Sequence, residues 1–91
     1  MVLTFIGIDP DTKEDSCPAA WVDREAMDFV FQGYKTDEAT QAETRKESPL
    51  PDHEAVIRIP ARLLPIIRAA CDEMERAMIE RGEVPVHEAV R

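Results

Sequence analysis

The sequence predicts an α+β fold, in which a small, mainly antiparallel sheet is covered on one face by one long C-terminal amphipathic helix. Two patterns lead to this prediction. Apolar residues alternate along several short segments, and they recur at helical spacing in one longer segment near the C-terminus. A chain of 91 residues is long enough for one modest core. We therefore expect a single domain at residues 1–82, followed by a tail at residues 83–91.

The first strand is expected at residues 2–8, which are mostly β-branched, aromatic or otherwise apolar. Apolar side chains fall on both faces of this strand, so we expect it to lie in the centre of the sheet or to be well covered. Residues 9–17 consist mostly of turn-forming and charged residues, which predicts a loop.

The next two strands are expected at residues 19–23 and 27–34, joined as a hairpin by a short charged turn. Phe29 and Phe31 lie on the same face of the second arm, which predicts one buried face and one wetter face. Trp21 is in the first arm, where it could reach an aromatic partner across the hairpin.

Residues 36–48 offer little to bury, because their only apolar residues are Ala39 and Ala42. Thr36 has a hydroxyl suited to capping the start of a helix. Two interpretations stay open for this segment. It is either an exposed helix of one to three turns or a mobile loop.

The longest predicted element is a helix at residues 62–81, which Gly82 is placed to end. Before it, residues 54–59 alternate as a half-buried strand that stops at Pro60. The apolar stripe of the helix is wider than one thin sheet needs, so core packing or a self-association seam is expected there, and we expect a homodimer. The stripe consists of Leu63, Ile67, Ala70, Cys71, Met74 and Met78.

The acidic charge is concentrated in the first part of the chain. Residues 1–54 carry 13 acidic and 5 basic side chains, whereas residues 55–91 carry 6 of each, which gives the net charge of −8. Phosphate backbones and anionic lipids are bound by Lys and Arg, so this charge argues against direct nucleic-acid or membrane binding and favours a basic protein partner. The alternative is that the acidic surface only keeps the protein soluble.

The candidate partner-binding residues are carboxylates in two predicted turns. Because these turns bury little, their side chains are expected to be available to a basic partner. They are Asp9, Asp11, Glu14, Asp15, Asp23 and Glu25.

No recognisable catalytic or metal-binding motif is present in the sequence. His53 and His87 do not lie near a Gly-rich elbow or a nucleophile in a recognised catalytic context. Residues 9–20 begin like a calcium loop, but Glu14 occupies the position where the turn needs Gly. We therefore predict no catalytic, cofactor-binding or metal-binding residues and a protein that is not an enzyme. A small-ligand binder or an enzyme is the minor alternative.

We expect a cytoplasmic protein. The apolar run Met1–Ile8 lacks the basic residues that precede such a run in a signal peptide, and no run approaches about 18 apolar residues. Cys17 lies in a predicted loop and is interpreted as a free thiol, whereas Cys71 lies on a predicted helix face and is interpreted as a small core residue.

Three segments resemble small acidic actinobacterial proteins of unknown function. They are Ala20-Trp-Val-Asp23, Phe31-Gln-Gly-Tyr34 and the run from Asp52 to Ala70. The likeness covers most of residues 3–75, and a chain with 8 Arg, 3 Lys and no Asn fits a high-G+C coding bias. Proteins of this type are often encoded near helix-turn-helix regulators, so the resemblance implies a regulatory or antitoxin-like role. It carries no functional residue across.

Two hypotheses of function follow from the sequence. The first is a non-enzymatic regulatory or adaptor module whose acidic surface binds a basic partner protein. The second is a structural, self-associating domain that forms a homodimer and has no ligand on its acidic surface.

Overall fold

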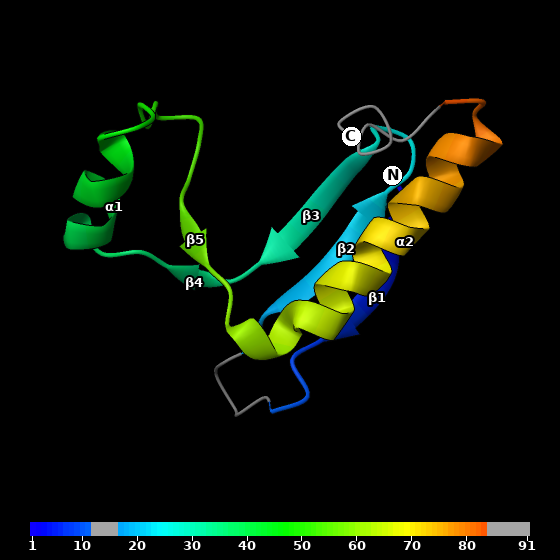
Figure 1. Cartoon of the computed structure of the whole chain (residues 1–91), viewed down its shortest axis with the longest axis horizontal. Helices are drawn as coiled ribbons and strands as arrows, with labels where there is room; N and C mark the ends of the chain where they lie inside the picture. Colours follow the sequence, from blue (N-terminus) through cyan, green and yellow to red (C-terminus); the bar gives the residue numbers. More distant parts are fainter. Residues whose placement is uncertain (12–16, 84–91) are drawn as a thin grey trace, which may run out of the picture.

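The chain folds into two arms that meet at an angle (Figure 1). The structure is a computed structural model, and it describes residues 1–11 and 17–83. The larger arm is a three-stranded sheet with the long helix on one face, which confirms the predicted α+β class. In chain order the elements are β1 (Thr4–Ile8), β2 (Ala19–Asp23), β3 (Asp28–Gln32), β4 (Tyr34–Lys35), α1 (Glu38–Arg45), β5 (Ile57–Arg58), the 3-10 turn η1 (Ala61–Leu63) and α2 (Leu64–Glu80).

The sheet is antiparallel with the strand order β1-β2-β3, so β2 lies in its centre. Val22 of β2 packs under α2 and is fully buried. Trp21 points to the opposite face of the sheet, since side chains alternate along a strand. Its ring lies 6.0 Å from that of Phe5 on β1. The expected aromatic partner across the hairpin is therefore absent, because the β3 residue opposite Trp21 is Val30.

β1 is an edge strand, and the prediction that it is central or well covered is wrong. A β-bulge between Phe5 and Gly7 makes Ile6 an extra residue in the strand, and Ile6 packs against the core under α2. Phe5 and Ile8 remain 57% and 45% exposed. The apolar pattern on both faces thus reflects one face under α2 and one open face.

α2 lies across β1 and β2 and contributes most of the core. Its close approach to β1 depends on Gly7, since a Cβ there would lie 3.1 Å from the side chain of Ile66. Pro65 occupies the first turn, where the missing N–H costs no hydrogen bond. Gly82 follows the helix with φ of 78°, as expected for a residue that ends a helix. The core cluster consists of Val22, Ala70 and Met74, with Ile6, Met27 and Met78 packed around it.

The smaller arm, residues 34–58, holds β4, α1 and β5. In it β4 and β5 pair only with each other, whereas the sequence placed residues 27–34 and 54–59 in the main sheet. α1 settles the open interpretation of residues 36–48, and it has no buried residue. Its N-cap is Asp37, which accepts a hydrogen bond from the Thr40 backbone N–H at 2.9 Å.

Polar contacts hold the smaller arm together. Thr36, expected as a cap, instead donates its hydroxyl to the carbonyl of Val56 at 2.8 Å. The Arg58 guanidinium donates to the hydroxyl of Thr40 at 2.7 Å, which ties β5 to α1. The stability of this arm therefore rests on hydrogen bonds rather than on apolar burial.

Hydrogen exchange should distinguish the two helices. We expect the backbone amides of α1 to be protected at least about tenfold less than those of α2, because α1 buries nothing and opens locally. Exchange measured by NMR or mass spectrometry on one sample provides its own control. Equal protection of the two helices would contradict this account of the arm.

Candidate functional site

The predicted carboxylates do not form one surface. Asp9 and Asp11 follow β1, whereas Asp23 and Glu25 lie at the other end of β2. Two further members, Glu14 and Asp15, lie outside the described residues.

Asp9 is held in an intramolecular ion pair. Its side chain is fully buried and accepts hydrogen bonds from Nε of Arg62 at 2.8 and 2.9 Å, while Nη2 of Arg62 lies 2.7 Å from Oδ2. The hydrogen bond from Arg62 lowers the pKa of Asp9, against the opposing effect of burial. This carboxylate therefore fixes the start of α2 against the end of β1 and is not exposed to a partner.

Asp23 is likewise engaged within the fold. Its Oδ1 accepts hydrogen bonds from the backbone N–H groups of Glu25 at 3.1 Å and Ala26 at 3.0 Å. These bonds shape the turn between β2 and β3, in which Met27 has φ of 60°. Of the four predicted carboxylates that the structure describes, Asp11 and Glu25 are the exposed ones. A basic partner thus meets isolated carboxylates at two ends of the sheet.

An apolar groove lies where the two arms meet. Its floor is β3, on the face of the sheet that α2 covers elsewhere. Phe29 and Phe31 are paired in register with Val22 and Ala20, so all four side chains point to that face. Their rings are stacked with centroids 5.9 Å apart, and Phe29 is 42% exposed. The expected buried face of β3 is therefore only partly covered.

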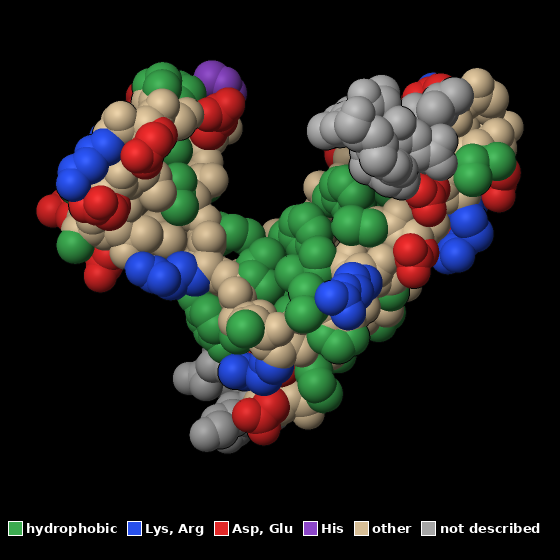
Figure 2. Space-filling view, in the orientation of Figure 1, with side chains coloured by type: hydrophobic (Ala, Val, Ile, Leu, Met, Phe, Trp, Pro, Cys, Tyr) green, Lys and Arg blue, Asp and Glu red, His purple; other side chains and the backbone are tan. Residues whose placement is uncertain are grey.

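The first wall of the groove is one flank of α2. Ile66 lies over Gly7 of β1, so the other flank of the helix faces β3. This flank carries Ile67, Cys71 and Met78, which follow one another at helical spacing. Figure 2 shows hydrophobic side chains gathered between α2 and the smaller arm.

The second wall is the ribbon of β4 and β5. Tyr34 of β4 is 37% exposed and Ile57 of β5 is 39% exposed, and they lie on opposite faces of the ribbon because Tyr34 pairs with Arg58 and Ile57 with Lys35. Gly33 joins this wall to the floor, and a Cβ at that position would lie 2.5 Å from the carbonyl oxygen of Arg58. Only glycine allows so close an approach of β5, so Gly33 sets the angle of the wall.

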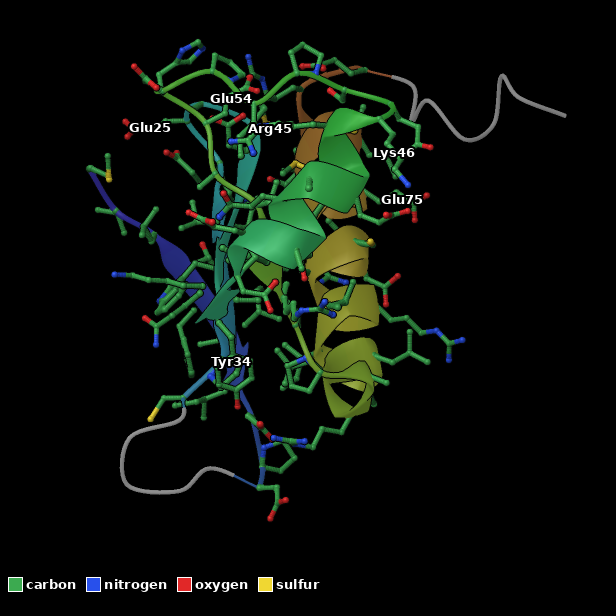
Figure 3. The ribbon with its side chains drawn as sticks, turned by 90° about the vertical axis from the view of Figure 1, so that its left-hand side faces the viewer. Glu25, Tyr34, Arg45, Lys46, Glu54 and Glu75 are labelled. Carbon is green, nitrogen blue, oxygen red and sulfur yellow. The ribbon has the colours of Figure 1, made fainter. Side chains whose placement is uncertain are left out.

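Acidic side chains flank the groove on both sides. Figure 2 shows them along α2 and at the tip of the smaller arm, beside the hydrophobic area. Figure 3, which faces the smaller arm, places Glu54 toward its tip, Tyr34 near its base and Glu75 on α2. Figure 2 also shows Lys and Arg side chains on α2 and on the smaller arm, so the apolar floor lies between walls that carry both signs of charge in a chain with a net charge of −8.

A separate hollow of about 410 Å³ lies within the smaller arm. Its lining mixes both signs of charge, including Arg45 of α1 and Glu54. Among the described residues, the single buried side-chain N or O atom without a hydrogen bond is Nε of Arg24, which lies outside this hollow. The full lining is Lys35, Thr36, Gln41, Arg45, Leu50, Pro51, Asp52, Glu54, Ala55, Val56 and Ile57.

The described residues contain no group of three or more His, Cys, Asp or Glu side chains placed to hold a metal ion. The His53 side chain is 82% exposed, and Nε2 lies 4.0 Å from a carboxylate oxygen of Glu54. Cys17 and Cys71 are not joined in a disulfide, Cys71 is exposed, and His87 lies outside the described residues. No helix in the described part of the chain is long and apolar enough to span a bilayer.

Comparison with protein-family models, curated proteins and solved structures finds no match for this chain.

Sequence reasoning missed Arg62 as the partner of Asp9, because nothing in the spacing of two residues 53 positions apart indicates contact. It also missed the groove. The available signals were the Phe29-Val-Phe31 alternation and Gly33 directly after it, but they do not show that α2 stops short of β3.

Replacing Gly33 should move the smaller arm. We expect Gly33→Ala to shift the NMR resonances of β4, β5 and α1, because the new methyl group collides with the Arg58 carbonyl. Gly7→Ala is the matched control. Its methyl group meets the flexible Ile66 side chain, so its changes should be confined to β1 and α2. Unchanged arm resonances in Gly33→Ala would contradict the close approach.

Acid should weaken the fold partly through Asp9. The pKa of Asp9 is lower in the folded protein than its usual value, so its stabilisation is present above about pH 4 and is lost as pH falls through the folded pKa. The free energy of unfolding of Asp9→Asn, measured with denaturant between about pH 6 and 2, should therefore fall less steeply as the pH is lowered than that of the parent protein.

Asp37→Asn is the control for this experiment. Its pKa is also lowered, chiefly by the backbone hydrogen bond from Thr40, but it caps a helix that buries nothing. Because Asp37 is exposed and its contacts are screened by solvent, the pH dependence of its unfolding free energy should stay closer to that of the parent protein than that of Asp9→Asn does. An Asp9→Asn curve parallel to the parent curve would show that this pair does not couple protonation to folding.

Proposed function

We propose that this protein is a non-enzymatic adaptor that binds an amphipathic helix of a basic partner protein in the groove between β3, α2 and the smaller arm. The observation that carries the proposal is the Phe29–Phe31 stack, in which Phe29 is 42% exposed and Phe31 only partly buried, on the face of the sheet where α2 packs mainly against β1 and β2. A second helix packed beside α2 would cover β3 as α2 covers its neighbours.

The chemistry of the partner follows from the surfaces around the groove. Aromatic and methionine side chains suit apolar residues that recur at i, i+3, i+4 and i+7 on one face of a helix. Glu54 and Glu75 on the two sides, together with the net charge of −8, favour Lys and Arg on the flanks of that helix. The exposed carboxylates of Asp11 and Glu25 add to the long-range attraction of a basic partner.

The proposal includes a regulatory role in the cytoplasm. Cys17 and Cys71 are not joined in a disulfide, which is typical of a protein in a reducing compartment. A regulator is the class of partner implied by the resemblance of three segments to small acidic actinobacterial proteins.

A designed peptide tests the groove directly. The probe is a helical peptide with leucines at i, i+3, i+4 and i+7 and lysines on both flanks. We expect its addition to shift the NMR resonances of Phe29, Phe31 and Met78, with affinity that falls as salt rises. A peptide with glutamates in place of the lysines is the control and should bind more weakly.

Two variants with matched chemistry locate the site. Phe29→Lys should weaken binding of the lysine-flanked peptide by roughly tenfold or more, because it places a charge on the apolar floor. Phe5→Lys alters an equally aromatic position on β1, away from the groove, and should leave the affinity within about twofold. Shifts confined to the arm tip, or equal losses in both variants, would refute the groove as the binding site.

A further inference from the structure

A second group of exposed apolar side chains lies at the β1 edge of the sheet. Of the nine large apolar residues exposed among the described residues, four lie in the first eight positions, namely Met1, Val2, Phe5 and Ile8. This edge is on the opposite side of the sheet from β3 and the groove. It is therefore a second surface that the proposed function does not use.

The backbone of β1 is open for pairing. β1 is hydrogen-bonded to β2 on one side only, so its other side presents unpaired N–H and C=O groups. Exposed edges are usually protected by Lys, Pro, inward charges or a β-bulge; residues 1–8 contain no charged side chain and no proline, and their protection is the bulge at Ile6. The bulge at Ile6 adds local twist but leaves Phe5 and Ile8 in the paired register.

Charge makes a second copy of this chain the suitable occupant. With a net charge of −8, two copies repel over most of their surfaces. Along β1 the strand is uncharged, so two β1 strands can approach without that repulsion. A basic partner would gain no electrostatic attraction from an uncharged strand, whereas the electrostatic repulsion between two copies is lowest there.

The helix flank above β1 is also balanced in charge. Ile66 lies over β1, and Glu73 and Glu80 follow it at intervals of two helical turns. Arg24 pairs with both glutamates, at 3.4 and 2.8 Å, and Arg76 pairs with Glu73 at 2.8 Å. This neutral flank would face its own copy across the dimer.

We propose that two copies associate through antiparallel β1–β1 pairing into a continuous six-stranded sheet. A two-fold axis normal to the sheet places both α2 helices on the same face, and it joins the two Phe5–Trp21 pairs into one apolar surface on the other. The interface is isologous and closed, so association stops at the dimer. The grooves lie at the two ends of this sheet, which makes the dimer bivalent for the proposed partner.

Sedimentation and hydrogen exchange on the full chain test this inference. We expect the dimer mass at tens of micromolar protein and dissociation on dilution. The outward N–H groups of β1 should exchange more slowly in proportion to the dimer fraction, while β3 amides should not respond. A monomer mass up to about 100 µM, or a dimer whose β1 exchange does not depend on concentration, would overturn it.

Two charged variants separate the two surfaces of the molecule. Phe5→Lys and Ile8→Lys should each raise the dimer dissociation constant roughly tenfold or more, since each sets like charges across the two-fold axis. Phe29→Lys is the control and should leave it within about twofold. Circular dichroism confirms that each variant is folded. An unchanged dimer dissociation constant in both β1 variants would refute the interface. That result would not contradict the proposed binding of the peptide in the groove.

Discussion

The ion pair of Asp9 and Arg62 sets the geometry on which the rest of the molecule depends. A fully buried carboxylate is costly unless it is paired and hydrogen-bonded, so Arg62 must lie beside the end of β1. Because Arg62 directly precedes α2, this contact fixes where the helix begins. At the other end, Arg24 joins the β2–β3 turn to Glu73 and Glu80. The helix is thereby aligned over β1 and β2.

The position of α2 explains both open apolar surfaces. A helix is about 10 Å wide and neighbouring strands lie about 4.8 Å apart, so α2 covers two strands, and on the third Phe29 is exposed and Phe31 only partly buried. Among the described residues, no helix or strand pairs with the far edge of the sheet, which leaves the outer side of β1 open. The two surfaces differ in their electrostatic setting. The groove lies between walls with charges of both signs in a net acidic chain, for which we propose a basic helix, whereas the β1 strand is uncharged, for which we propose a second copy.

The smaller arm contributes shape more than stability. It is held by side-chain hydrogen bonds of Thr36, Gln41 and Arg58 and buries no residue of α1. Its angle is set by the backbone contact at Gly33, which brings β5 close to the end of β3. An arm of this kind can adjust to a bound partner at low cost, since few apolar contacts must be broken when it moves.

The sequence by itself determined the α+β class, the positions of the long helix and the main hairpin, and the acidic character of the first half. These follow from local periodicity and composition, which any short window of the chain contains. It did not determine that β1 is an edge strand, that β4 and β5 form a separate ribbon, or that Asp9 and Asp23 are engaged within the fold. Those outcomes depend on which distant residues meet, such as Asp9 with Arg62 and Gly33 with Arg58. Only the tertiary structure decides them, because the cost of burying a charge or a backbone group is set by the partner that the fold brings to it.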